Sequence, residues 1–135
     1  KYQIKMREIK FRGKRKDNNQ MIYGDLCTYD YMVFIGVAKT IFQIRKGVFV
    51  PNVIWYEVLP ESIGQFSDLK DKNRKEIYEG DIFDSPSKNK FKVIFDNGCF
   101  YYQNIVDEHP IGLLKEVAED WKIIGNIYEN LELEK

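Results

Sequence analysis

Short segments in which apolar and polar residues alternate are the feature that most constrains the fold of this chain. In residues 90–96, apolar side chains occupy every second position. The turn signal Asp96-Asn97-Gly98 follows, and residues 99–103 are typical of the returning strand of a hairpin. Similar segments recur at a spacing of roughly ten residues, which favours a sandwich or a barrel. The sequence therefore predicts a mainly β, compact fold of short antiparallel strands.

One segment departs from this period of two. Between residues 111 and 120 and just beyond, apolar residues recur at steps of three and four, namely Leu113, Leu114, Val117 and Trp121. This spacing predicts one short helix. A division near Pro60 is also expected, with a β-meander over residues 6–60 and a small-barrel part over residues 61–135, both within a single domain of residues 1–135.

The composition is that of an ordinary folded protein. Hydrophobic residues make up 44% of the 135 residues, and 21 basic residues balance 21 acidic ones. Disorder would require low hydrophobicity and a large net charge, so it is excluded. Net neutrality also argues against a strongly basic nucleic-acid-binding protein, although a local basic patch stays possible. The aromatic content of 15% favours strands.

The two cysteines and the hydropathy pattern favour a protein of the cytoplasm. Cys27 and Cys99 lie outside any CxxC motif, so we expect free thiols in a reducing compartment; a bridge between them is the alternative. No apolar run approaches the ~20 residues that span a bilayer, and we expect no signal peptide and no membrane association. Residues 1–5, which precede a start-like sequence at Met6, are given no functional weight.

Three segments together carry a resemblance to a known family. They are residues 6–12 (MREIKFR), residues 64–82 (GQFSDLKDKNRKEIYEGDI) and residues 121–133 (WKIIGNIYENLEL). In this combination the chain resembles the YopX family, which phages of Gram-positive bacteria and their prophages encode. The resemblance implies a mostly β fold with a small SH3-like barrel in the C-terminal part. It also implies an accessory protein of the host bacterial cytosol, and it implies no biochemical activity.

The chain departs from the family pattern at three places. Ser67-Asp68 replaces the usual Thr-Gly, Arg74 replaces a Gly, and Leu131 replaces a Pro. A Gly after Asn normally supplies a positive φ in such a turn. We therefore expect either a different turn type here or Asn73 in the left-handed conformation.

The most distinctive residues of these segments have a structural explanation. They are Tyr78, Gly80, Asp81, Gly125 and Asn126. Gly80 can adopt a backbone conformation that a β-carbon forbids, so the chain can bend sharply into the strand that starts at Asp81. The Asp81 carboxylate can accept backbone N–H groups at that bend. This interpretation requires no ligand.

The sequence offers no catalytic, metal or cofactor site. His109 is the only histidine and lies in a polar loop with Asp107 and Glu108, where three adjacent residues rarely converge on one ion. Glu116 and Asp120 fit a solvated face. Neither GxGxxG nor GxxxxGK[ST] occurs. We therefore predict a protein that is not an enzyme and that carries no cofactor.

Two binding functions stay open. A β-rich neutral protein with many aromatic residues can present an edge strand or an aromatic patch to a phage or host protein, or to itself as a homo-oligomer, and we favour this hypothesis. The alternative is a small barrel that binds nucleic acid. Its candidate residues are two basic clusters, Lys14, Arg15 and Lys16, and Lys70, Lys72, Arg74 and Lys75, with aromatic partners in Phe100, Tyr101 and Tyr102.

Overall fold

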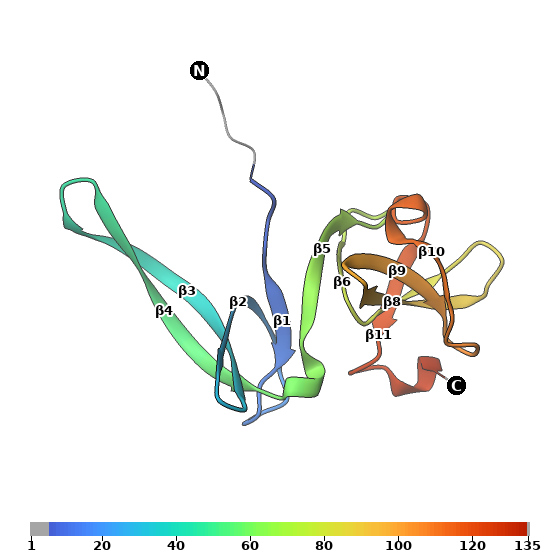
Figure 1. Ribbon diagram of the computed structural model, residues 1–135, viewed down its shortest axis with the longest axis horizontal. Coiled ribbons are helices and arrows are strands. Elements are labelled where there is room, and N and C mark those ends of the chain that lie inside the picture. Colours follow the sequence, from blue (N-terminus) through green and yellow to red (C-terminus); the bar gives the residue numbers. More distant parts are fainter. Residues whose placement is uncertain (1–5, 135) are drawn as a thin grey trace, which may run out of the picture. The chain divides into compact units, whose positions relative to one another are not determined.

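The chain is mainly β, as predicted. The computed structural model describes residues 6–134 (Figure 1), so residues 1–5 and 135 lie outside it. Over the described range the elements are eleven strands and three short 3₁₀ helices, without an α-helix. None of these helices is long and apolar enough to cross a membrane. The strands are β1 (Phe11–Lys14), β2 (Met21–Tyr29), β3 (Met32–Arg45), β4 (Val48–Val58), β5 (Gly64–Lys70), β6 (Glu76–Tyr78), β7 (Asp81–Asp84), β8 (Lys90–Asp96), β9 (Cys99–Asn104), β10 (Pro110–Leu113) and β11 (Lys122–Asn126).

The described chain has two antiparallel sheets and divides into two compact units, and the six-stranded sheet contributes strands to both units. The strand order is β4-β3-β2-β1-β5-β6 in one sheet and β10-β9-β8-β7-β11 in the other. The first unit comprises Ile9–Gln65, and the second comprises the described residues before Ile9 and after Gln65. The division falls within β5, whose first residues pair with β1 and whose later residues pair with β6.

The first unit is built around a close approach of two strands. A β-carbon on Gly24 would collide with the carbonyl oxygen of Gly36, and one on Gly36 would stand 2.6 Å from the Trp55 ring. Glycine therefore lets β2, β3 and β4 meet here. At the C-terminal end of β4, Val58 forms an isolated β-bridge with Arg15, which directly follows β1.

The five-stranded sheet covers the core of the second unit. Five buried residues form this core, namely Ile77, Phe83, Val93, Leu114 and Ala118. The Trp121 ring stacks on Phe91 at a centroid distance of 4.9 Å and meets Phe83 edge-on. Within the described chain β10 and β11 are the two edges of this sheet, so the expected small barrel is an open sheet without a closing strand pair.

The predicted helix over residues 111–120 is wrong as an α-helix. Pro110–Leu113 forms strand β10 along β9, and only Leu114–Glu116 makes a turn of 3₁₀ helix before further turns. Apolar residues recur three and four positions apart here because the 3₁₀ helix and the turns after it bury both Leu114 and Ala118 in the core. Strand pairing with β9 stabilises the preceding residues more than an isolated helix of ten residues could be stabilised in water.

The Gly80 bend lies at the centre of the second unit. Gly80 has φ 93°, its N–H donates to the Val93 carbonyl, and its carbonyl accepts the N–H of Ile127. The buried Asp81 carboxylate accepts the Tyr78 N–H at 2.7 Å. One tight turn thus joins β8 and the segment after β11.

A buried carboxylate organises a second turn. Asp71 accepts the N–H groups of Asn73 and Lys75 through Oδ1 and the N–H of Ile123 through Oδ2, all within 2.9 Å. Backbone donors satisfy both of its oxygens, which is what a buried charge requires. The turn after β5 is thereby fixed to β11.

Residues other than glycine occupy the left-handed positions of this region. Arg74 and Asp68 both have φ 67°. The expectation that Asn73 adopts the left-handed conformation is therefore wrong, since Arg74 itself adopts it. The Asp71 carboxylate accepts the Asn73 N–H, and the Asp71 carbonyl accepts the Arg74 N–H, so two hydrogen bonds hold the turn around Arg74.

We expect Gly80→Ala to lower the free energy of unfolding by about 2–4 kcal/mol, because it combines backbone strain with overpacking. Its β-carbon would stand 2.7 Å from the Tyr128 ring. Gly98→Ala is the matched control, since Gly98 has φ 78° but a β-carbon there would meet no atom within 4 Å. Urea unfolding of both variants measures the difference. An equal decrease in the free energy of unfolding of both variants would show that the contact with Tyr128 does not contribute.

Arg74→Gly is expected to raise the free energy of unfolding by about 0.5–1 kcal/mol. The left-handed conformation costs an L-residue about 1–2 kcal/mol, and the greater entropy of unfolded Gly offsets about half of that. Lys72→Gly, in the same turn but outside the left-handed region, should be destabilising instead. Thermal unfolding of the two variants shows whether each one is more or less stable than the wild type. Lower stability of both variants would contradict the strain argument.

Candidate functional site

The long hairpin of β3 and β4 is the part of the first unit with the fewest neighbours (Figure 1). Strand β2 pairs with β3 only between Met32 and Gly36. Beyond Gly36, β4 is the one strand among the described residues that pairs with β3. We call residues 37–54 the arm. Within the described part of the chain it is a two-stranded ribbon without a third strand or a covering layer of its own.

The arm carries large apolar side chains that stay exposed. Ile41 is 67% exposed, Phe49 61%, Ile44 60% and Phe42 51%. A two-stranded hairpin is at best marginally stable in water without a surface to pack on. Contiguous exposed apolar side chains mark interaction surfaces in soluble proteins. The arm is therefore the candidate functional site of this chain.

The strand register assigns these side chains to two faces. Opposed residues of an antiparallel pair share a face, and the pairs Ile41–Pro51 and Gln43–Phe49 lie on one of them. Along β4 the same face continues through Val53 to Trp55, opposite Gly36. We call Ile41, Phe49, Pro51, Val53 and Trp55 the apolar stripe. Phe42 and Val50 lie opposite each other on the other face.

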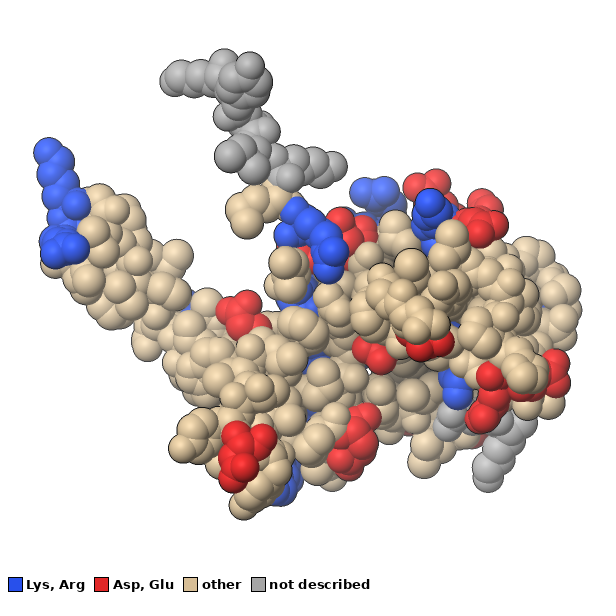
Figure 2. Space-filling view, viewed as in Figure 1, with Lys and Arg blue, Asp and Glu red and all other residues tan. Residues whose placement is uncertain are grey.

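The charges of the arm have a single sign. Lys39, Arg45 and Lys46 are its ionisable residues, and no acidic residue occurs between Asp30 and Glu57. Figure 2 shows basic side chains gathered at the end of the hairpin and uncharged surface along the rest of its visible length. The nearest acidic residue on β2 is the exposed Asp25, which pairs with Gly36 at the base.

The first predicted basic cluster is largely paired. Arg15 donates to both carboxylate oxygens of Asp17 at 2.9 and 2.6 Å and lies over the Tyr56 ring at 4.2 Å. This hydrogen bond holds the pKa of Asp17 below its ordinary value. Lys16 contacts Glu57 at 3.1 Å, and the Lys14 N–H donates to the Ser62 hydroxyl. The ion pairs of Arg15 and Lys16 reduce the attraction of the cluster for phosphates, whereas the Lys14 hydrogen bond involves its backbone.

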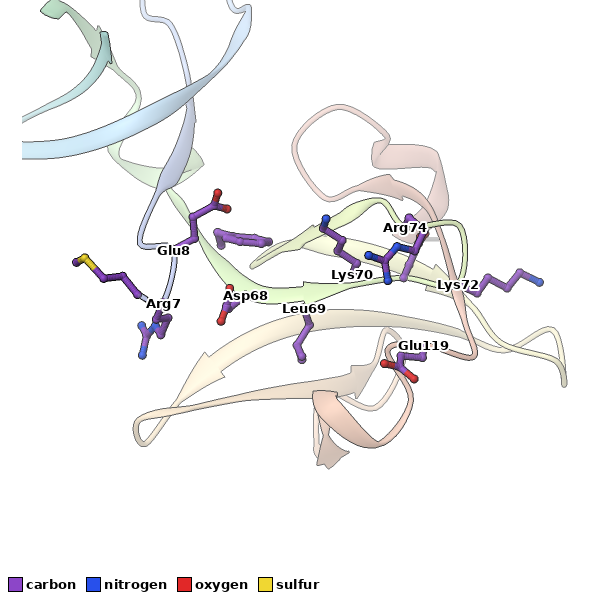
Figure 3. A pocket seen from close by; sticks show the side chains of 11 residues that line it. Arg7, Glu8, Asp68, Leu69, Lys70, Lys72, Arg74 and Glu119 are labelled. Carbon is purple, nitrogen blue, oxygen red and sulfur yellow. The ribbon is translucent and has the colours of Figure 1, made fainter. Parts of the chain in front are cut away.

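The second predicted cluster surrounds a wide hollow of the second unit with a volume of about 940 Å³ (Figure 3). Three of its four residues line the hollow, and Lys75 lies outside the lining. Both signs of charge occur there: the basic residues are Arg7, Lys70, Lys72 and Arg74, and the acidic ones are Glu8, Asp68, Asp71 and Glu119. The Asp71 carboxylate is committed to backbone donors. This mixture does not form a concentrated anion site.

The remaining candidates are placed in the core or in loops. Tyr78, Gly80 and Asp81 are buried or nearly so, and Gly125 and Asn126 are half-buried. Asn126 accepts the N–H groups of Tyr128 and Glu129. The Tyr102 ring lies 5.0 Å from that of Trp121, and Phe100 contacts Phe95, so both help to fill the interior. Tyr78, Gly80, Asp81 and Asn126 thus make hydrogen bonds at turns, whereas Gly125 lies within β11 opposite Ile82.

Ionisable and thiol groups do not gather into a reactive site in the described chain. His109, Asp107 and Glu108 are exposed, and so are Glu116 and Asp120. Among the side chains that the structure describes, no group of three or more His, Cys, Asp or Glu could hold a metal ion. Cys27 and Cys99 are free, as predicted, and the structure places both in exposed positions.

Sequence reasoning missed the arm, although a signal was present. The recurring short segments of the sequence predict strands at residues 40–45 and 48–50, without indicating whether their faces are covered. However, apolar residues occupy both alternating positions at Ile41-Phe42 and at Phe49-Val50. Strands that are apolar on both faces are typical of sheets covered on both faces. The exposure of Ile41, Phe42 and Phe49 shows that the first unit does not provide this cover.

Comparisons with known proteins agree with the resemblance noted in the sequence. The family model described as YopX protein matches residues 10–134. No curated protein matches the chain. The crystal structure of protein EF1440 from Enterococcus faecalis is similar, with 23% sequence identity, a TM-score of 0.60, and coverage of 95% of this chain and 99% of that chain. At this identity the likeness shows a shared fold alone. Because the family model matches most of its length, the chain belongs to the YopX family.

Proposed function

We propose that this chain is a non-enzymatic phage or prophage accessory protein of the bacterial cytoplasm that assembles with itself through the arm. The observation that carries this proposal is the exposure of Ile41 and Phe49 on a ribbon that the rest of the first unit leaves uncovered. Their burial would contribute about 1.5–3 kcal/mol for each fully covered side chain. Assembly thereby supplies the packing that a two-stranded hairpin lacks.

A protein surface fits the arm better than nucleic acid does. The arm has three basic residues among 18, whereas most of its exposed side chains are apolar or aromatic. Protein interfaces favour aromatic and apolar residues at their centre, while phosphate recognition depends on dense positive charge. The pairing of Arg15 with Asp17 and of Lys16 with Glu57 also weakens the alternative of a nucleic-acid-binding barrel.

Self-assembly predicts a concentration-dependent increase in mass that depends on the arm. We expect the double variant Ile41→Ser/Phe49→Ser to raise the dissociation constant at least about a hundredfold, because both copies lose two buried side chains. Size-exclusion chromatography with light scattering over a range of concentrations measures the change. The variant should fold normally, since both side chains are exposed in the single chain.

Val106→Ser is the matched control for this experiment. Val106 is 83% exposed but lies in the second unit, in the loop after β9. Its replacement should leave the mass profile unchanged. A wild-type chain that stays monomeric at every concentration would refute self-assembly, as would equal effects of the arm variant and the control.

A further inference from the structure

We infer that two copies of the chain pack their arms face to face and antiparallel, through the apolar stripe, with Lys46 of each copy beside Asp25 of the other. This inference rests on the proposed function and specifies its geometry. Ile41, Phe49, Pro51, Val53 and Trp55 would form the centre of the contact. The occupant of the stripe is a second copy of the same stripe.

The edges of the arm are poorly suited to strand addition. Proline has no N–H, and within sheets it is confined to positions that do not donate to a neighbouring strand, so Pro51 interrupts the outer edge of β4. On β3 the register with β4 shifts between Ala38 and Thr40 and again between Gln43 and Arg45. Such bulges blunt an edge against further pairing. The faces of the ribbon are therefore the surfaces left for a partner.

Of the two faces, the stripe is the one that carries an acidic residue at its base. It runs from Phe49 near the turn to Trp55, which is 47% exposed and shares its face with Asp25. Both faces hold exposed apolar side chains, since Phe42 is 51% and Ile54 42% exposed on the other one. The pairing of basic and acidic ends is therefore what favours the stripe as the interface between two copies.

The area of the stripe is sufficient for a weak dimer. Five partly exposed side chains per copy would together bury about 1,000 Å² over both copies, if each contributes roughly 100 Å². This value lies at the lower end of specific interfaces. Dimerisation should therefore depend on concentration in the micromolar range.

Charge decides the direction of packing. The turn residue Lys46 stands at one end of the stripe, and Asp25 shares its face at the other end, because Asp25 pairs with Gly36 and Gly36 pairs with Trp55. A parallel arrangement would bring the basic ends of both arms together, which is repulsive. The antiparallel arrangement places each Lys46 beside the Asp25 of the partner. Its two-fold axis then passes near Pro51, midway along the stripe.

Cross-linking tests the face. In a chain with Cys27→Ser and Cys99→Ser, Pro51→Cys places a thiol on the stripe near the axis, and Asn52→Cys places one on the opposite face. A bis-maleimide that spans about 10 Å, the distance between packed sheets, should link two Pro51→Cys chains rapidly. Asn52→Cys chains should react with each other much more slowly at the same concentration.

Charge reversal tests the direction. Lys46→Glu should weaken dimerisation about tenfold or more, because it places like charges together at both ends of the contact. Adding Asp25→Lys to the same chain should restore the wild-type mass profile. Asp25 is exposed, so we expect neither substitution to destabilise the folded chain.

The outcomes separate this inference from the proposed function. A dimer that persists while Asn52→Cys cross-links as fast as Pro51→Cys, or that ignores the charge reversal, overturns the face-to-face geometry and leaves self-assembly intact. A chain that is monomeric at all concentrations overturns both. The alternative result is a monomer that co-elutes with a duplex oligonucleotide and releases it at high salt and after Lys46→Glu. That result overturns both self-assembly and the face-to-face geometry, and it supports nucleic-acid binding.

Discussion

Positions that leave no room for a β-carbon are the constraint on which both units depend. In the first unit the Gly24–Gly36 contact lets β2, β3 and β4 meet and lets Trp55 lie across them. In the second unit Gly80 bends the chain between two strands while its N–H and carbonyl both bond across the sheet. The larger apolar residues then fill the space that these contacts define. Because most other residues would add atoms within 3 Å of a neighbour, these positions tolerate little change.

The two units use apolar residues in opposite ways. In the second unit Phe83, Trp121 and Phe91 interlock around the core, and Asp71 and Asp81 satisfy backbone donors in its turns. In the first unit the β-structure extends beyond its core as the arm, and side chains of the same type remain in water. A protein that places so many apolar side chains on a ribbon without an interior gains stability from them only when something covers them. If the arm assembles as proposed, function and stability are coupled there.

Strand positions were the most predictable part of the fold. The alternation at residues 90–96 and the Asp96-Asn97-Gly98 turn correspond to β8 and its hairpin with β9. The helix prediction failed because Leu113 and Leu114 reach the core through a strand and a turn, and both patterns place apolar residues three or four apart. The Arg74 turn could not be resolved either, since the local sequence does not reveal that Asp71 fixes the backbone around it through three hydrogen bonds.

The sequence by itself determined that this chain is mainly β, that its turns require glycine at Gly80, and that it belongs with the YopX proteins, because these properties depend on local periodicity, backbone conformation and recurring motifs. Only the tertiary structure decided which apolar residues are core and which are surface. Ile35 and Ile41 look alike in the sequence, yet Ile35 is fully buried and Ile41 is 67% exposed. The physical reason is that Ile35 lies where β3 pairs with strands on both sides, whereas Ile41 lies beyond the end of the β2 pairing at Gly36, and pairing between distant segments does not follow from local sequence.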